Sequence, residues 1–392
     1  MSKLVAMEGN QAASEAMRQI EPDVVAAYPI TPQTEVVQWF ASYVADGRVK
    51  TEFVPVESEH SAMSACVGAA AAGARVMTAT SACGMALMWE ILYIASSLRL
   101  PICMVLVNRA LSGNINIHCD HSDSMGARDT GWLQLYSENA QEAYDNILQA
   151  PRIAEALRLP VMVCYDGFLI SHSVEGIRLE EDDAVKQFVG EYQPGEYSLL
   201  DLEHPVTVGP LDLWDFYFEH KRSQMEGYVP AKETVLKVGK AFGEAFGRPY
   251  RLMELHQMED ADLALISLGS TAGTAVDVVD DVRRKGIKAG TIKLRSFRPF
   301  PADELAVALQ SAKAVAVLDR CGVYGSQFAP LATEVMAALY HAGARIPVVN
   351  YVYGLGGRAV HPADLESVFE DLESVASVGA AAEPVRFLGV RE

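Results

Sequence analysis

The stretch Thr51–Gly84, TEFVPVESEHSAMSACVGAAAAGARVMTATSACG, decides the fold of this chain. Its first six residues predict a short strand, residues 58–73 a helix of small side chains closed by glycine, and residues 75–80 the next strand. A strand, a helix and a strand in this order form one unit of a parallel α/β sheet. Glu57 and Glu59 then lie in the turn from strand to helix, at the edge where such sheets bind ligands.

Two interpretations of this glutamate pair stay open. Acidic side chains are favoured in any first helical turn, where each contributes about 0.3–1 kcal/mol, and Ser58 is suited to cap the helix. Alternatively, a carboxylate at this edge serves a bound ligand. The run CVGAAAAGA that follows carries little side-chain bulk, so its helix can lie close to another backbone and suits a buried subunit interface.

The composition is typical of an acidic cytoplasmic enzyme with more than one domain. With 392 residues the chain is too long for one ordinary core, and its 50% hydrophobic content is enough for sizeable cores. The net charge of −19 argues against binding to nucleic acid or to an anionic membrane surface, because both require basic residues. The polar N-terminal stretch predicts no secretory signal, and no apolar run is long enough to span a bilayer.

The six cysteines include no C-x-x-C pair. Scattered cysteines of this kind predict reduced, mostly buried thiols. Iron–sulfur clusters need closely spaced cysteine ligands, so we expect no cluster to be held by this chain alone. The cysteines are Cys66, Cys83, Cys103, Cys119, Cys164 and Cys321.

A second turn from strand to helix follows the predicted strand VVAA, residues 24–27. In the next stretch, YPITPQT, Thr31 is placed to cap a helix that has Pro32 at its first position. This is either an ordinary helix start or an anion site, formed by backbone N–H groups and a hydroxyl at the end of a strand. Both interpretations stay open.

Arg109 follows the continuous apolar strand PICMVLVN, residues 101–108, which is of the kind buried on both faces of a sheet. It should therefore lie at the same sheet edge as Thr31 and Glu59. A guanidinium pairs with a carboxylate through two N–H groups. Arg109 accordingly either grips an acidic substrate or forms a structural salt bridge.

A long irregular segment, residues 111–132, comes next. Loops of this length are usually functional or disordered, and Trp132 argues against disorder. The cluster His118–Asp123, HCDHSD, invites interpretation as a metal site, but its ligands are too close in sequence to reach one ion together. We therefore expect a lid or an active-site wall here, and no metal ion on this chain.

The predicted domain division is residues 1–232 and 233–392. From about residue 176 the first domain includes a connection that we expect to wrap around the body, because Trp214 and its aromatic neighbours require burial. Strands and helices alternate again from residue 262 onward, which predicts a second parallel sheet with covering helices.

Several segments of the sequence resemble those of one protein family. They are YPITPQTE, VESEHSAMSACVGAAAAGAR, TATSACG, VLVNRAL, RDTGWLQLYSENAQEAYD, LRSFRPFP and YGLGGRAVHPADL, and together they span nearly the whole chain. In this order and spacing they resemble the α subunits of the 2-oxoacid:ferredoxin oxidoreductases, in particular the pyruvate:ferredoxin oxidoreductase branch. Agreement among several independent segments makes the resemblance specific.

The resemblance implies an α/β fold in two parts: a pyrimidine-binding domain of the thiamine diphosphate enzymes, then a domain similar to the C-terminal domain of transketolase. It implies that a β subunit holds the diphosphate and Mg²⁺ of thiamine diphosphate, that partner subunits carry the [4Fe-4S] clusters, and that the partners in the complex are of β, γ and δ type. Coenzyme A is the implied co-substrate and ferredoxin the implied electron acceptor. The present chain agrees with this, because it lacks the G-D-G motif of a diphosphate site.

Matched residue by residue, the resemblance gives roles to particular side chains. Glu59 corresponds to the family glutamate that hydrogen-bonds the aminopyrimidine ring of the cofactor and so activates it, with Glu57 as the competing choice. Thr31 and Arg109 correspond to positions that hold the carboxylate and carbonyl of the substrate. Pro29, in the same turn as Thr31, is expected to line the thiazolium ring.

The implied function is oxidative decarboxylation of pyruvate with coenzyme A to acetyl-CoA and CO2, with electrons passing to ferredoxin; the reverse direction is carbon fixation in anaerobic metabolism. Alternative substrates are a branched-chain 2-oxoacid, 2-oxoglutarate or oxalate. In a different class, the chain would be a non-catalytic assembly subunit, but the presence of Glu59, Thr31 and Arg109 argues against that. A nucleotide-binding oxidoreductase is disfavoured, because the glycine-rich turns at residues 269–273 and 354–357 are incomplete as nucleotide motifs.

Overall fold

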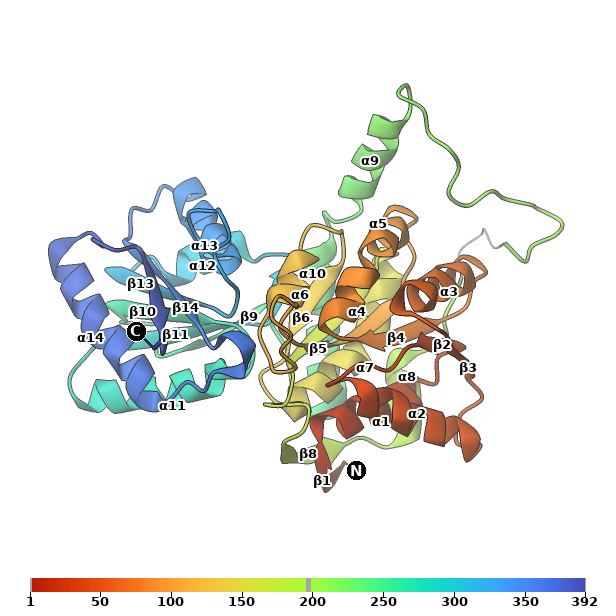
Figure 1. The fold of residues 1–392 in the computed structure, drawn as a ribbon, viewed down its shortest axis with the longest axis horizontal. Coiled ribbons are helices and arrows are strands. Elements are labelled where there is room, and N and C mark those ends of the chain that lie inside the picture. The colour runs from red at the N-terminus through yellow and green to blue at the C-terminus, as the bar shows by residue number, and fades with distance from the viewer. Residues whose placement is uncertain (1, 195–198, 392) are drawn as a thin grey trace.

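The computed structural model describes residues 2–194 and 199–391, which form two α/β bodies side by side (Figure 1). The N-terminal body is built on a seven-stranded sheet and the C-terminal body on a six-stranded sheet. Both sheets are mostly parallel, with helices between successive strands, so the predicted α/β fold class is confirmed.

The strands of the first sheet lie in the order β12 (Ser296–Arg298), β6 (Leu133–Tyr136), β7 (Val161–Asp166), β5 (Cys103–Asn108), β4 (Val76–Thr80), β2 (Val24–Ala27) and β3 (Glu52–Pro55). Every neighbouring pair except β12 and β6 is parallel. Strands β4, β5 and β7 are buried along their whole length, which explains their continuous apolar sequence. The carboxyl ends of β5, β4, β2 and β3 therefore meet at one sheet edge.

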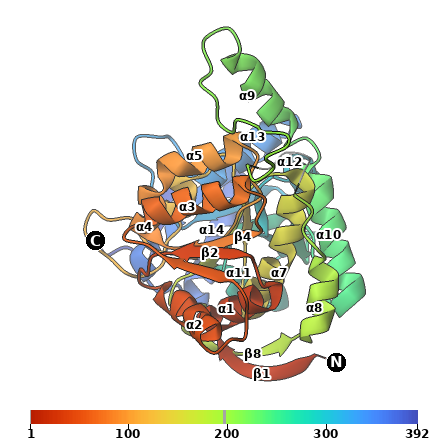
Figure 2. The same cartoon turned by 90° about the vertical axis from the view of Figure 1, so that its right-hand side faces the viewer.

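Two layers of helices cover this sheet, as Figure 2 shows. One layer consists of α1 (Gly9–Ile20), α2 (Thr34–Ala45), α7 (Ala140–Leu157) and α10 (Ala231–Phe246). The other consists of α3 (Glu59–Ala71), α4 (Ala82–Leu87) and α5 (Trp89–Ser97). The small-residue helix predicted at residues 58–73 is thus confirmed as α3. A two-stranded ribbon of β1 (Lys3–Glu8) and β8 (Val174–Leu179) lies at the bottom of the view in Figure 1. The helix that follows it, α8 (Asp182–Val189), packs into the core shared by α1, α7 and α10.

The second sheet has the order β15 (Val385–Leu388), β14 (Val348–Tyr353), β13 (Ala314–Asp319), β10 (Leu263–Ser267), β11 (Ala289–Leu294) and β9 (Met253–His256). Only β9 is antiparallel to its neighbour. Its covering helices are α11 (Thr271–Arg284), α12 (Ala302–Ala308), α13 (Pro330–His341) and α14 (Pro362–Val378), with a short 3₁₀ turn at Leu355–Gly357. The alternation predicted from residue 262 onward is confirmed.

The two bodies share packing. β12 comes from the second half of the sequence but pairs with β6 of the first sheet, and α10 packs against α7. One hydrophobic core contains side chains from both bodies, among them Trp132 of the N-terminal body and Ile266 of the C-terminal body. The boundary at residue 232 stays a prediction.

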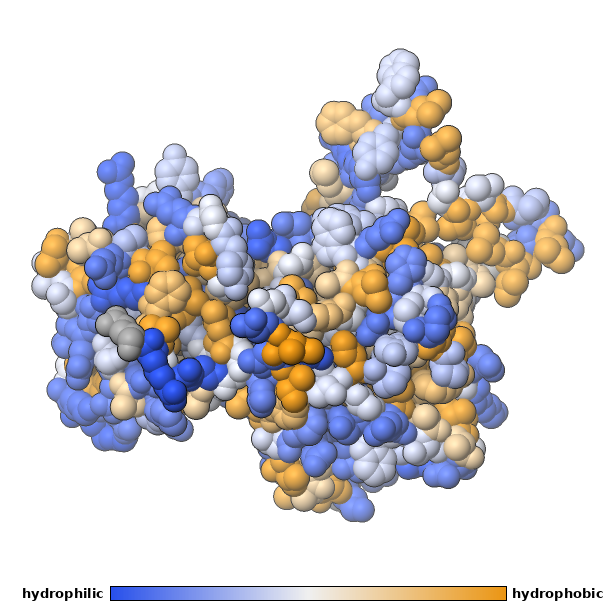
Figure 3. Space-filling view, viewed as in Figure 1, coloured by the Kyte–Doolittle hydropathy of each residue, from blue (hydrophilic) through white to orange (hydrophobic). Residues whose placement is uncertain are grey.

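An arm, residues 199–226, projects from the N-terminal body and ends in α9 (Tyr217–Glu226), which has no buried residue (Figure 1). Trp214 is 92% exposed and Phe218 74% exposed, so the expectation that this chain buries these rings is wrong. The physical reason is that the segment around these rings projects into solvent, whereas Val208 earlier in the arm packs against a hydrophobic core, and Figure 3 shows apolar side chains of the arm in the open. Throughout the described ranges, no helix combines the length and apolar character required to cross a bilayer.

Candidate active site

Glu59 is the first residue of α3, at the predicted turn. Ser58 precedes it as the N-cap and accepts a hydrogen bond from the backbone N–H of Ser61 at 3.2 Å. Glu57 is exposed and accepts a hydrogen bond from the Ser61 hydroxyl, which lowers the pKa of the Glu57 carboxyl. Glu59 is only 6% exposed. The two glutamates thus have different environments: Glu57 is a solvated acid at a helix start, and Glu59 is buried at the sheet edge.

The side chain of Glu59 lies against the turn that follows β4. A Cβ atom on Gly84 would lie 2.7 Å from Oε1 of Glu59 and 2.5 Å from Oγ1 of Thr80, so glycine is required for this close approach. Oγ1 of Thr80 is buried and has no hydrogen-bond partner in the described part of the chain. Over the same ranges, no donor or cation binds the Glu59 carboxylate. The Glu59 carboxylate is therefore available to a ligand, whereas the Thr80 hydroxyl beside it is a buried polar group that lacks a partner.

The turn after β2 differs from the prediction. Helix α2 begins after Gln33, so the prediction that Thr31 caps the helix, with Pro32 at its first position, is wrong. The chain first makes a tight turn, in which the Gln33 N–H donates to the Ile30 carbonyl at 2.7 Å and the Gln33 side chain accepts from the Ile30 N–H at 3.2 Å. Pro29 and Thr31 remain exposed at the sheet edge, where their predicted roles require them.

Arg109 directly follows β5, as predicted, and is 6% exposed. Its Nη1 donates to the carbonyl oxygen of Thr31 at 2.8 Å, and its Nε donates to the carbonyl of Asn116 at 2.9 Å. Within residues 2–194 and 199–391, no carboxylate pairs with this guanidinium. The structural salt bridge considered above is therefore absent from these ranges, and a nearly buried positive charge lies beside Thr31.

Sequence reasoning missed Asp123, which lies in α6 (Ser122–Gly126) within the long loop. Its carboxylate accepts hydrogen bonds from the backbone N–H groups of Arg109, at 2.9 Å, and Ala82, at 3.1 Å. The sequence signal was weak: the HCDHSD run was interpreted only as a metal site or a lid. Nothing in the spacing pairs an acid with a backbone group fourteen residues earlier.

The same loop contributes to a buried cluster between the two bodies. Cys119, His121 and Asp166 lie close enough to hold a metal ion. However, the guanidinium of Arg320 donates to Asp166 at 2.8 Å and to the sulfur of Cys119 at 3.5 Å. A cation is thus already present among these groups, and Ser270 also donates to Asp166. The cluster joins the two bodies.

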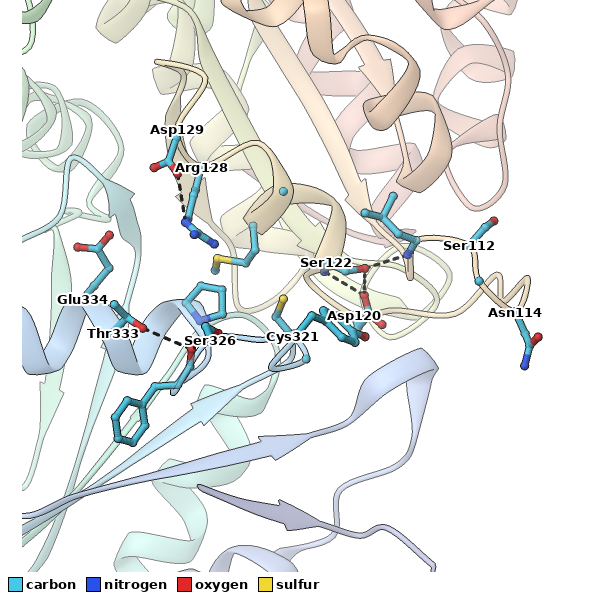
Figure 4. A pocket seen from close by; sticks show the side chains of 18 residues that line it. Ser112, Asn114, Asp120, Ser122, Arg128, Asp129, Cys321, Ser326, Thr333 and Glu334 are labelled. Carbon is cyan, nitrogen blue, oxygen red and sulfur yellow. Dashed lines mark hydrogen bonds and ion pairs between the residues drawn. The ribbon is translucent and has the colours of Figure 1, made fainter. Parts of the chain in front are cut away.

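A cavity of about 960 Å³ lies between this loop and the segment after β13 (Figure 4). Asp120, Asp129 and Glu334 make its lining acidic, against Arg128. None of the side chains of the predicted site lines it. The loop therefore forms the wall of a separate cavity, while the predicted site lies on an open sheet edge.

Comparison with known proteins covers most of the chain. Residues 15–240 match the family described as pyruvate flavodoxin/ferredoxin oxidoreductase, thiamine diphosphate-binding, and residues 261–365 match pyruvate:ferredoxin oxidoreductase core domain II. The chain is 56% identical over 390 residues to pyruvate synthase subunit PorA of Thermotoga maritima, covering 99% of this chain and 98% of the relative. It is 43% identical over 374 residues to ketoisovalerate oxidoreductase subunit VorA of Pyrococcus horikoshii, covering 95% of this chain and 94% of the relative.

Two solved structures share the fold. The 2-oxoglutarate:ferredoxin oxidoreductase of Magnetococcus marinus matches with a TM-score of 0.73 at 21% identity, over 94% of this chain and 65% of the other. An inactive β4 tetramer of a split gene transketolase matches with a TM-score of 0.56 at 12% identity, over 95% of this chain and 100% of the other. Sequence and fold agree, and the chain belongs to the pyruvate:ferredoxin oxidoreductase family as a subunit of α type.

Proposed function

We propose that this chain, together with partner subunits, catalyses the oxidative decarboxylation of pyruvate with coenzyme A to acetyl-CoA and CO2, with electrons passing to ferredoxin. One observation carries the proposal. Glu59 and Arg109 are each 6% exposed, carry opposite charges at one sheet edge, and have no charged partner in the described ranges. A buried charge without a partner is costly, so such a pair is best explained by ligands that complete it.

The substrate end of the site is assigned to Arg109 and Thr31. Two of the guanidinium N–H groups of Arg109 are used by the carbonyls of Thr31 and Asn116, which fix its orientation. The remaining donors are free for the carboxylate of a 2-oxoacid. The exposed Thr31 hydroxyl, on the residue whose carbonyl binds Arg109, is placed to donate to the same substrate. These residues bind and orient, and the charge of Arg109 offsets that of the substrate.

The residues present fit thiamine diphosphate as the cofactor. Glu59 would hold the aminopyrimidine ring through its free carboxylate, the orphaned hydroxyl of Thr80 lies beside it, and Pro29 would line the thiazolium ring. Thiamine diphosphate supplies, when bound, the nucleophilic carbon and the electron sink for decarboxylation. The contribution of Glu59 is to hold a proton at the ring nitrogen that faces it, and burial of its carboxylate strengthens that interaction.

The remaining parts are assigned to partner subunits in a cytoplasmic complex. We assign the diphosphate and Mg²⁺ to a β-type subunit, and the [4Fe-4S] clusters to partner subunits in a complex that also contains γ- and δ-type subunits. Two observations support this assignment. The sequence has no G-D-G motif, and all six cysteines are free and scattered, five of them buried. The apolar arm, residues 199–226, is also more exposed than a lone subunit would favour.

The test is coenzyme A-dependent reduction of a viologen dye, without oxygen, by the native complex purified through this chain. Pyruvate, 2-oxoisovalerate, 2-oxoglutarate and oxalate are supplied in turn. We expect a preference for pyruvate; a preference for 2-oxoisovalerate would favour the second candidate, which the 43% identity to a ketoisovalerate enzyme subunit supports. No reduction with any acid, despite bound thiamine diphosphate, would overturn the catalytic proposal in favour of an assembly role.

A further inference from the structure

The carboxylate of Asp123 forms hydrogen bonds with segments that lie far apart in the sequence. It is 2% exposed and accepts four hydrogen bonds, from the Asn108 side chain at 2.8 Å and from the backbone N–H groups of Ser124 at 2.7 Å, Arg109 at 2.9 Å and Ala82 at 3.1 Å. The first two donors bind Oδ1 and the last two bind Oδ2. Each carboxylate oxygen of Asp123 therefore accepts two hydrogen bonds.

Oδ2 of Asp123 contacts both the Arg109 side and the Glu59 side of the predicted site. Arg109 is the residue at the end of β5 whose guanidinium lies beside Thr31. Ala82 begins α4, two residues before Gly84, against which the Glu59 side chain packs. One carboxylate oxygen thus fixes both the backbone that carries the guanidinium and the turn that forms the wall beside Glu59.

Ala82 is also held in an unusual backbone conformation. Its backbone angle φ is +40°, in a region that residues other than glycine rarely adopt. Such a conformation persists only where surrounding contacts determine it. The hydrogen bond from the Ala82 N–H to Asp123 is one such contact, so its loss should let this turn relax toward a different position.

Among the residues that the structure describes, no cation forms an ion pair with Asp123 to explain its burial. All four of its donors are neutral amides, and burial raises the pKa of its carboxyl to about 6 against the opposing effect of the hydrogen bonds. A hydrophobic residue would be easier to bury at this place. The presence of a carboxylate at this place is therefore best explained by the positions in which its hydrogen bonds hold Arg109 and Ala82.

We propose that Asp123 is a positioning residue that fixes the Arg109 guanidinium and the Ala82–Gly84 turn in their positions relative to Glu59. This inference rests on the proposed function for the roles of Arg109 and Glu59. It differs from that proposal in naming what sets their relative position.

The chain contains a matched control for this residue. Asp319, at the end of β13, accepts hydrogen bonds from the backbone N–H groups of Leu331 and Ala332 and from the Asn350 side chain. It is 1% exposed, and burial raises the pKa of its carboxyl to about 6. Asp319 matches Asp123 in burial and also accepts from backbone N–H groups and an asparagine side chain, with three donors instead of four, but it anchors α13 and not the Glu59 edge. Loss of Asp319 reports the general cost of removing a buried carboxylate.

Asp123→Ala, Asp123→Asn and Asp319→Ala are compared with wild type in the native complex. Asp123→Ala should raise KM for the preferred 2-oxoacid at least tenfold and lower kcat, because small misplacements of binding groups are costly. Asp123→Asn should restore KM to within about threefold. Its amide oxygen can still face Arg109 and Ala82, and the unpaired Oδ1 of Asn108 can accept from its NH2 after the Asn108 amide turns. Asp319→Ala should lower thermal stability and leave KM unchanged.

A second readout does not depend on activity. Amide hydrogen exchange of the full chain, followed in peptides that contain residues 82 and 109, should accelerate in Asp123→Ala and not in Asp319→Ala. If Asp123→Ala fails to assemble, Asp123→Ser replaces it, since a hydroxyl is too short to reach both N–H groups. An unchanged KM in assembled Asp123→Ala or Asp123→Ser overturns the inference, whether or not exchange changes. A wild-type complex inactive with every 2-oxoacid refutes the proposed function instead.

Discussion

Asp166 and Arg320 form an ion pair of 2.8 Å between the two bodies, and both side chains are buried. Burial raises the pKa of Asp166, but the charges of Arg320 and His121 outweigh it and hold the pKa below its usual range. The two sheets are therefore connected by a charge pair inside a shared core.

We expect Asp166→Asn to destabilise the full chain by about 3–5 kcal/mol, since it leaves the buried Arg320 charge uncompensated. A carboxyl whose pKa is lowered by folding stabilises the protein above its ordinary pKa, and the effect is lost only as the pH falls below that value. The difference from wild type should thus persist from pH 7 to pH 5. It is measured by denaturant unfolding, and a variant as stable as wild type would contradict the role of this pair.

Gly84→Ala should disturb Glu59 with little effect on the rest of the fold. The added carbon would lie 2.7 Å from Oε1 of Glu59, which has to move away. We expect turnover to fall by at least tenfold, as for other small misplacements of catalytic groups. Gly68→Ala, in the same helix as Glu59, is the control, because a Cβ there meets nothing within 4 Å. Equal activity of the two variants would show that the Gly84 contact is unimportant.

Glu59→Gln should leave the complex assembled and its clusters intact, while turnover falls by about 10²–10⁴-fold, the usual contribution of acid–base catalysis. The reason is that the amide cannot hold a proton at the cofactor ring. Viologen reduction and iron content are measured together. Glu57→Gln serves as the control, because this carboxylate is exposed and pairs with Ser61. Wild-type turnover in Glu59→Gln would remove Glu59 from the mechanism.

Arg109→Ala should raise KM for the 2-oxoacid, because the charge that pairs with the substrate carboxylate is lost. A hydrogen-bonded charge contact contributes about 1.5–3 kcal/mol, which corresponds to roughly 10- to 150-fold in KM. Arg109→Lys should give an intermediate value, since a lysine keeps the charge without the paired N–H geometry. Steady-state kinetics of the complex measures KM for each variant. KM values equal to wild type in both variants would exclude a role of Arg109 in binding the substrate carboxylate.

The buried Asp319 predicts a pH effect of opposite sign to that of Asp166. Its pKa is about 6 in the fold, above the ordinary value of 3.8, so the folded state binds the proton more tightly. Stability from this group therefore increases as the pH falls below about 6. Relative to Asp319→Asn, wild type should gain on the order of 1 kcal/mol between pH 7 and pH 5. Denaturant unfolding of both proteins at pH 7 and pH 5 measures this gain. A difference in unfolding free energy that is the same at both pH values would contradict the raised pKa of Asp319.

Local patterns made much of this structure predictable. The apolar strand before Arg109 and the small-residue helix after Ser58 placed two charges at one sheet edge, because parallel strands bring their carboxyl ends together. The turn at Thr31 was predicted less well, since a side-chain contact of Gln33, not propensity, sets where α2 begins. Asp123 could not be predicted, because its partners come from backbone groups that only the folded sheet brings together. The exposed arm was missed because apolar sequence does not specify which chain covers it.

The arm also has a consequence for how cells make this subunit. A chain synthesised in excess over its partners presents Leu202, Leu211 and Trp214 to the surrounding solvent, each at least 88% exposed. Chaperones and proteases recognise such segments, so surplus copies are removed while assembled copies persist. Balanced translation of the subunit messages then becomes a requirement for yield, and producing this chain alone in a foreign host should return mostly aggregates or arm-cleaved fragments.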